Sequence, residues 1–176
     1  MKSVLISIQP KWCELIANGK KTIEVRKTKP KLDTPFKVYI YCSGKDYDKV
    51  FYIDKFMHKV FLNGNGKQKV IGEFVCDEIF EIKYQCGSYR CKGLTVLEND
   101  RVASDSKLSL YDMRSYLSCN NGYGWHISNL VIYDKPKELS EFYKEEYCYP
   151  CVKPIKRPIT RPPQSWCYVE SLGDTQ

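Results

Sequence analysis

The chain has 176 residues, of which 43% are hydrophobic and 28% are charged, and its formal net charge is +7. These values are typical of a soluble globular protein with one well-packed domain, and no apolar run is long enough for a transmembrane helix. The positive charge favours a polyanionic partner, because Lys and Arg that neutralise phosphates release counterions. The first residues lack the long apolar core and cleavage site of a secretory signal, so we predict a cytoplasmic protein without a membrane partner.

The nine cysteines are an odd number and are scattered through expected helix, strand and loop segments. This distribution argues against a disulfide framework. Cys148 and Cys151 have the spacing of half a zinc site, but no second pair stands at a comparable spacing. We therefore predict no metal site and no cofactor.

The first 26 residues predict a strand, a short helix and a second strand. Residues 4–8 are strand-like, Pro10 suits the first turn of a helix, and Gly19 suits the left-handed residue that ends it. Apolar and polar residues then alternate over 22–26, which is typical of a strand.

Beyond residue 26, alternating apolar residues and turn signals predict four more strands and a few short helices. The Asn-Gly-Asn-Gly run at 63–66 is a strong turn signal, and Ser109 is a candidate helix cap. Residues 85–105 show little periodicity and are expected to wrap the surface. We expect a basic loop at 27–35, strands at 36–43, 69–82, 123–132 and 165–170, and helical segments at 54–61, 110–117 and 137–143.

The segment 147–163 is rich in proline and basic residues, which argues against a helix or a central strand. Its basic part, 153–161, is either an extension of a nucleic-acid track or a solvated linker. The total is about six strands with no strand–helix–strand rhythm, which predicts a small mixed or antiparallel β-barrel. We expect residues 1–170 to form one domain and residues 171–176 to form a C-terminal tail.

Several polar groups are concentrated in the run Gly-Lys-Lys-Thr-Ile-Glu-Val-Arg at 19–26. In a strand, Thr22, Glu24 and Arg26 point to one face, because successive side chains alternate. Lys20 and Lys21 precede the strand, where an ammonium group can meet an anion or polarise a carbonyl. This arrangement predicts the rim of a polar cleft.

The spacing of Gly19, Lys21, Glu24 and Arg26 resembles the G-x-K-x-x-E-x-R signature of ASCH domains, a branch of the PUA-like superfamily. Segments 7–10, 72–79, 125–127 and 162–166 are also similar to parts of this family, the last of them in phage and bacterial members. The resemblance implies an α+β fold: a PUA-like small mixed β-barrel of about six strands with short flanking helices. It also implies a cleft in which the signature residues face RNA or a nucleotide.

The resemblance implies two kinds of activity. The first is binding of RNA or a modified nucleotide or nucleoside. The alternative is a hydrolase that acts on N4-acetylcytidine or on RNA, with Lys21 and Glu24 as candidate catalytic residues. One enzymatic branch uses a lysine, a threonine and a glutamate; Lys21 matches its lysine, but Glu24 stands where that branch has threonine. The third residue stays open among Glu73, Glu98 and Asp100.

We predict six ligand-binding residues, and each has a structural alternative. Lys21, Glu24 and Arg26 could instead form an exposed strand face with a Glu–Arg pair. Trp125 could stack a base, although tryptophan in such a strand is more often part of the core. A protein-interaction module with an unknown partner is a third class of function. The predicted ligand-binding residues are Lys20, Lys21, Thr22, Glu24, Arg26 and Trp125.

Overall fold

The computed structural model describes residues 2–44, 52–54, 59–61, 68–85, 88–91, 96–147 and 153–172. A five-stranded sheet with the order β10-β6-β3-β1-β13 forms its centre. Strands β1 and β3 run parallel, and the other neighbouring pairs are antiparallel. The five strands are β1 (Lys2–Ile8), β3 (Phe36–Cys42), β6 (Val70–Cys76), β10 (Ser128–Lys137) and β13 (Trp166–Glu170).

A second sheet has four strands in the order β2-β9-β7-β8, so that β2 lies at its edge. Its strands are β2 (Ile23–Arg26), β7 (Ile79–Gln85), β8 (Ser88–Cys91) and β9 (Gly122–His126). Two short antiparallel pairs complete the described strands: β4 (Tyr52–Asp54) with β5 (Lys59–Phe61), and β11 (Tyr143–Glu146) with β12 (Ile155–Pro158).

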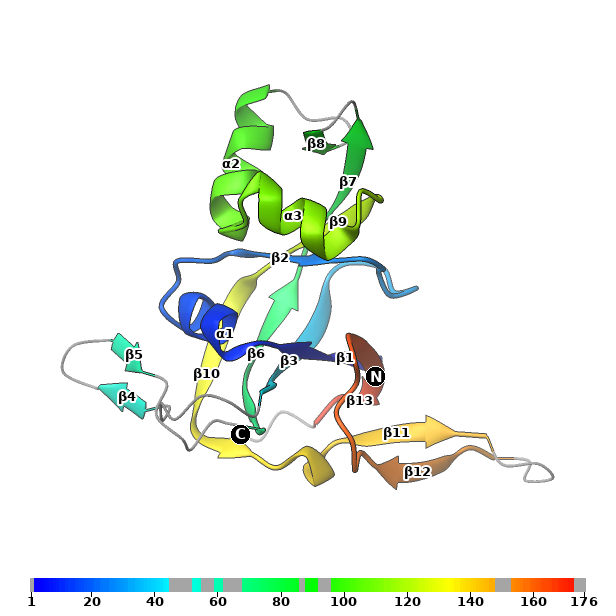
Figure 1. Ribbon diagram of the computed structural model, residues 1–176. Coiled ribbons are helices and arrows are strands. Elements are labelled where there is room, and N and C mark those ends of the chain that lie inside the picture. The colour runs from blue at the N-terminus through cyan, green and yellow to red at the C-terminus, as the bar shows by residue number, and fades with distance from the viewer. Residues whose placement is uncertain are drawn as a thin grey trace.

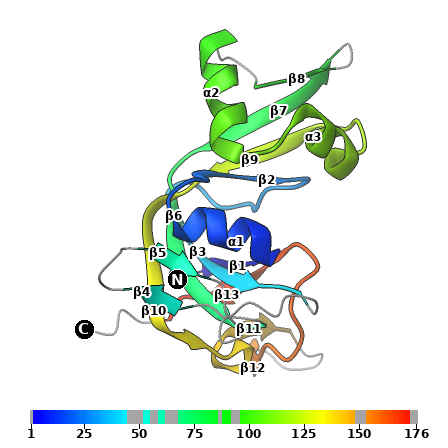
Figure 2. The ribbon, with the colours of Figure 1, turned by 60° about the vertical axis from the view of Figure 1, so that its left-hand side comes forward.

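The described helices are α1 (Pro10–Ala17), α2 (Val96–Ser106), α3 (Leu110–Leu117) and the short 3-10 helix η1 (Leu139–Glu141). Helices α2 and α3 lie with the four-stranded sheet at one end of the molecule, and the β11–β12 hairpin lies at the other end (Figure 1). Figure 2 shows the same arrangement from another side, with α1 between the two ends. No described helix combines the length and the hydrophobicity needed to cross a membrane.

Local sequence explains the two helices that matter for the site. Pro10 starts α1, where its missing N–H would have had no partner in the helix. Gly19 follows α1 with φ +66°, as predicted. Ser109 caps α3 through a reciprocal capping box with Asp112: the Ser109 Oγ accepts from the Asp112 backbone N–H at 3.1 Å, and the Ser109 backbone N–H donates to the Asp112 carboxylate at 3.1 Å.

The strands of the central sheet bury both faces. Val4, Ile6 and Ile8 pack into a core below α1, whereas Leu5 and Tyr39 pack into a second core on the other face. A third core lies between the four-stranded sheet and helices α2 and α3, and it contains Ile23, Val25, Ile82, Val102 and Leu117. Burying each such aliphatic side chain contributes about 1.5–3 kcal/mol relative to exposure.

The predicted six-stranded PUA-like barrel is wrong. The described strands form separate sheets that do not close, and they occur together with helices in a mixed α+β arrangement. The predicted strand 69–82 divides into β6 and β7, and the predicted strand 123–132 divides into β9 and β10. One half of each run joins the five-stranded sheet, and the other half joins the four-stranded sheet. Two runs that seemed to be single strands therefore connect two sheets, which periodicity alone does not reveal.

Other segments also differ from the predictions. Residues 85–105, which have little periodicity and were expected to wrap the surface, contain β8 and most of α2, and the predicted helical turn at 54–61 overlaps β4 and β5. The prediction for 147–163 agrees with the structure: its described part forms no helix or central strand, and β12 pairs with β11 in an exposed two-stranded hairpin. The predicted turn at 63–66, Cys148 and Cys151 lie outside the described residues.

Candidate functional site

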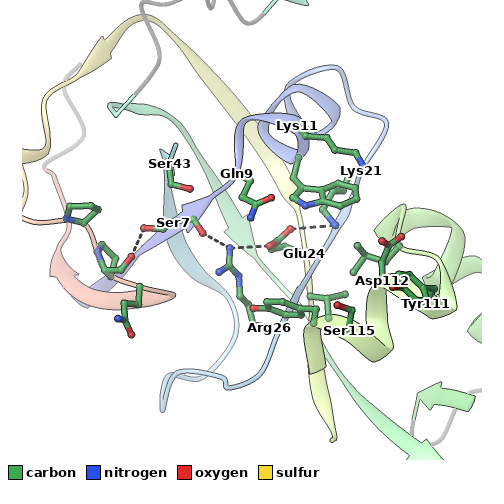
Figure 3. Close-up of a pocket in the computed structure, with 17 residues that line it drawn as sticks. Ser7, Gln9, Lys11, Lys21, Glu24, Arg26, Ser43, Tyr111, Asp112 and Ser115 are labelled. Atoms are coloured by element: carbon green, nitrogen blue, oxygen red, sulfur yellow. Dashed lines mark hydrogen bonds and ion pairs between the residues drawn. The ribbon is translucent and has the colours of Figure 1, made fainter. Parts of the chain in front are cut away.

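A cleft of about 770 Å³ opens beside the free edge of β2, between α1, α3 and the segment before β13 (Figure 3). The floor and walls therefore come from segments that are distant in the sequence. The cleft is lined by Ser7, Gln9, Lys11, Trp12, Lys21, Glu24, Val25, Arg26, Ser43, Leu108, Tyr111, Asp112, Ser115, Tyr116, Pro162, Pro163 and Gln164.

Three charged side chains of this cleft form one buried cluster. The Glu24 carboxylate lies between two cations: its Oε1 is 2.9 Å from Arg26 Nη2, and its Oε2 is 3.3 Å from Lys21 Nζ. All three side chains are at most 8% exposed. The cluster, called the Lys21–Glu24–Arg26 triad below, carries one excess positive charge when each group is ionised.

The Lys21 ammonium group is held by three acceptors. Its Nζ donates to the Ile23 carbonyl at 2.8 Å and to the Ser106 carbonyl at 2.6 Å, in addition to its contact with Glu24. An ammonium group has three N–H donors, so these partners use all of them. Burial lowers the pKa of Lys21, and the Glu24 carboxylate opposes this shift. Lys21 therefore acts as a fixed positive charge that positions Glu24.

Arg26 connects the triad to two other segments. Its Nη2 donates to the Ser7 carbonyl at 2.6 Å, and the Ser7 hydroxyl donates to the Pro163 carbonyl at 2.6 Å. The buried Nε of Arg26 has no hydrogen-bond partner among the described residues. These contacts join β2, the end of β1 and the segment before β13 at the floor of the cleft.

Aromatic side chains form much of the rim. Trp12 contacts two lysines, with the Lys11 ammonium 4.6 Å and the Lys21 ammonium 5.2 Å from its ring centroid. Tyr111 is 80% exposed at the start of α3, and Tyr116 lies near the end of the same helix. Burial raises the pKa of Tyr116, and the nearby Arg26 opposes this shift. The rim therefore offers flat apolar surfaces above a charged floor.

The structure brings together three of the six predicted ligand-binding residues. Lys21, Glu24 and Arg26 line the cleft, whereas Lys20 is an exposed turn residue outside it. Thr22 is half-buried and also lies outside the cleft, and its backbone bonds to Asp105 and Ile127.

Trp125 is fully buried and does not line the cleft. Its ring centroid lies 5.9 Å from that of Phe36 and 6.0 Å from that of Trp166. Trp125 is therefore a core residue and not a ligand-binding residue of this cleft. Its Nε1 has no hydrogen-bond partner among the described residues.

The other candidate acids are not at the cleft. Glu73 contacts Lys37 at 3.0 Å and accepts a hydrogen bond from Tyr133, and Asp100 is exposed on α2. The side chain of Glu98 is outside the described part of the chain. Among the residues that the structure describes, no group of three or more His, Cys, Asp or Glu side chains could hold a metal ion.

Sequence reasoning missed the contribution of α3 to the site. This helix supplies Tyr111, Asp112, Ser115 and Tyr116 to the cleft. The capping signal at Ser109 predicted the helix but gave no information about what it faces. The signal that could have indicated this role is the composition of the helix, which is short and carries several polar and aromatic side chains.

One family model matches part of the chain. The ASCH domain model matches residues 6–85, which include the whole triad. No curated protein matches the chain.

The solved structures that resemble the chain include ASCH from Zymomonas mobilis. It has 16% sequence identity and a TM-score of 0.53, and the alignment covers 96% of this chain and 87% of that one. A tyrosine-to-phenylalanine mutant of that protein has 17% identity and a TM-score of 0.55, with 97% and 91% coverage. A serine-to-alanine mutant has 18% identity and a TM-score of 0.52, with 96% and 88% coverage. The predicted resemblance is thus confirmed: residues 6–85 match the ASCH domain, and the chain shares the fold of a solved ASCH protein.

Proposed function

We propose that the cleft binds RNA or a nucleotide. The observation that carries this proposal is the Lys21–Glu24–Arg26 triad, a buried cluster with excess positive charge at the floor of an aromatic-rimmed cleft. A volume of about 770 Å³ lies in the range of small-molecule sites, which are about 300–1,000 Å³. Such a site is suited to a ligand that combines an anion with a flat ring.

Each part of a nucleotide has a matching group in the cleft. The excess positive charge attracts a phosphate, and the exposed ring of Tyr111 offers a stacking surface for a base. The Glu24 oxygens each retain acceptor capacity beyond their contacts with Lys21 and Arg26, because an ionised carboxylate has about four lone-pair sites. Glu24 can thus accept a hydrogen bond from a base N–H or a ribose hydroxyl.

The test compares two exposed tyrosines. Tyr111→Ala removes a ring from the cleft rim, and Tyr147→Ala removes an equally exposed ring outside the cleft; their exposures are 80% and 81%. We expect Tyr111→Ala to weaken binding of short single-stranded RNA by about 5- to 150-fold, the range for loss of one base-stacking contact. Tyr147→Ala should leave the affinity unchanged. Equal effects of the two substitutions, or no binding by the wild-type protein, would contradict the proposal.

Hydrolysis of a modified nucleoside or of RNA is the second candidate function. It is favoured by the Glu24 carboxylate, which lies in the cleft and could act as a general base for water. It is weakened by the three hydrogen-bond partners of Lys21, which occupy all of its N–H donors and leave none for a substrate. The test is incubation of purified protein with N4-acetylcytidine and with RNA. Products that form with the wild type and disappear in Glu24→Gln, at a temperature where thermal unfolding shows that the variant is still folded, would support hydrolysis.

The proposal also covers the domain boundary and the location of the protein. We propose one ASCH domain over residues 1–170, in a cytoplasmic protein of phage or bacterial type. Expression of the isolated segment 1–170, followed by a single cooperative unfolding transition, would support the domain boundary.

A further inference from the structure

Two lysine–tyrosine pairs flank the end of β2, at the edge of the cleft and just beyond it. The Lys27 ammonium lies 5.5 Å from the ring centroid of Tyr116, and the Lys29 ammonium lies 5.3 Å from that of Tyr123. Both lysines are exposed and belong to the loop that follows β2. We call these four residues the exit surface.

The exit surface is continuous with the cleft at two points. Tyr116 itself lines the cleft, and Tyr123 pairs with Arg26 in the register between β2 and β9. Side chains of directly opposed residues lie on the same face of a sheet. A chain that leaves the cleft past Arg26 therefore meets the exit surface next.

The charges of this surface are largely uncompensated. No carboxylate in the described part of the chain forms an ion pair with Lys27. Lys29 has Glu81 at 4.0 Å, and both side chains are more than 40% exposed, so water weakens this contact. Asp112, an acid that lines the cleft, is held in the cap of α3.

The other basic region predicted from the sequence is different. On the β11–β12 hairpin, Glu146 contacts Lys144 at 2.6 Å and Arg157 at 3.2 Å, and Lys156 contacts Glu170 at 2.6 Å. These partners neutralise much of the basic segment 153–161. Of the two regions, the exit surface is the better site for a polyanion.

We propose that the exit surface binds the continuation of a single-stranded nucleic acid, one nucleotide of which occupies the cleft. This inference rests on the proposed function and narrows it from RNA or a nucleotide to a polynucleotide strand. Lys27 and Lys29 neutralise backbone phosphates, and the tyrosine rings offer faces to unpaired bases. A duplex keeps its bases stacked on one another and does not present those faces.

The experiment compares Lys27→Ala/Lys29→Ala with Lys135→Ala/Lys153→Ala. The control lysines are also exposed but lie on β10 and just before β12, away from the cleft. The ligands are a mixed-sequence single-stranded RNA of about eight nucleotides, within the usual site sizes, its DNA counterpart, its duplex form, and the four nucleoside monophosphates. Thermal unfolding of both variants confirms that each is folded.

We expect the wild type to bind the single strand at least about tenfold more tightly than any monophosphate, consistent with one added stacking or phosphate contact. In Lys27→Ala/Lys29→Ala, this ratio should fall, and the slope of log affinity against log salt should decrease by about 1.4, because each phosphate contact contributes about 0.7 for a single strand. The control variant should retain both values. If single-stranded DNA also binds more tightly than the monophosphates by the same ratio, the exit surface binds a single strand with either a ribose or a deoxyribose backbone.

Three outcomes would overturn the inference. They are equal wild-type affinity for the single strand and the monophosphates, an unchanged salt slope in Lys27→Ala/Lys29→Ala, and duplex binding as tight as single-strand binding. The first outcome leaves the proposed function intact. Failure of the wild type to bind any of the ligands would overturn the proposed function as well.

Discussion

Replacing Glu24 by glutamine removes the negative charge from between two buried cations. Lys21 Nζ and Arg26 Nη2 lie 3.3 and 2.9 Å from its carboxylate oxygens, and the three side chains are nearly inaccessible to water. Breaking a buried ion pair by removal of one partner lowers the free energy of unfolding by about 3–5 kcal/mol. At about 2–4 °C per kcal/mol for a chain of this size, the thermal midpoint falls by about 6–20 °C.

A matched control exists on the surface of the same protein. Glu146 also lies between two cations, Lys144 at 2.6 Å and Arg157 at 3.2 Å, but its side chain is 40% exposed. Water and salt screen such a contact. Glu146→Gln should therefore leave the thermal midpoint almost unchanged. The two substitutions make the same chemical change in a buried and an exposed cluster of similar geometry.

The assay is thermal and urea unfolding of both variants at several pH values. In Glu24→Gln, burial lowers the pKa of Lys21 without opposition from a carboxylate. The unfolded chain holds the Lys21 proton up to about its usual value of 10.5, and the folded chain releases it at lower pH. The unfolded state of the variant then binds more protons than its folded state, so its free energy of unfolding rises with pH. The difference in stability between the variant and the wild type should therefore become smaller as the pH approaches 10.5. Equal losses in Glu24→Gln and Glu146→Gln, or a deficit that widens as pH rises toward 10.5, would refute this reasoning.

Three further predictions test other parts of the structure. Ser109→Ala removes half of the capping box with Asp112 and should lower the free energy of unfolding by about 1 kcal/mol, with faster amide exchange at the start of α3. Gly72→Ala places a Cβ closer to the Val131 carbonyl oxygen than van der Waals contact allows, so urea unfolding should show a loss of about 1–3 kcal/mol or more in the free energy of unfolding, whereas wild-type stability would contradict this steric clash. Burial raises the pKa of the Cys76 thiol from 9.0 to about 12, so the folded state retains a proton that the unfolded state loses, and stability falls as pH rises from 9.0 toward 12. In Cys76→Ala, unfolding measured on both sides of pH 9.0 should show a smaller fall, and an unchanged profile would contradict the assignment.

Local patterns predicted the parts of the site that depend on local geometry. The period of two placed Glu24 and Arg26 on one face of β2, where they oppose Trp125 and Tyr123 across the sheet. Gly19 follows α1 as the left-handed residue that its position predicted. These predictions required only the preferences of a strand and of a helix end.

Contacts between distant segments were beyond the same reasoning. The position of Lys21 depends on the Ser106 carbonyl, 85 residues away along the chain. Likewise, the division of 69–82 into β6 and β7 is set by the different partners of its halves, β3 and β10 for one and β8 and β9 for the other. A periodic apolar run carries the same signal whether it stays in one sheet or passes into a second. The barrel was therefore a reasonable but wrong interpretation of correctly located strands.

The triad serves the fold as well as the cleft, and this decides which residues can test binding. Lys21 attaches β2 to the end of α2, and Arg26 attaches β2 to the end of β1. Any substitution in the triad therefore changes stability along with the charge of the cleft, so loss of binding there has two explanations. Replacing Tyr111 should change stability little, because its ring is 80% exposed and contributes little to the core. Exposed positions such as Tyr111 on the rim and Lys27 and Lys29 on the exit surface therefore allow the proposed binding to be tested without a large change in stability.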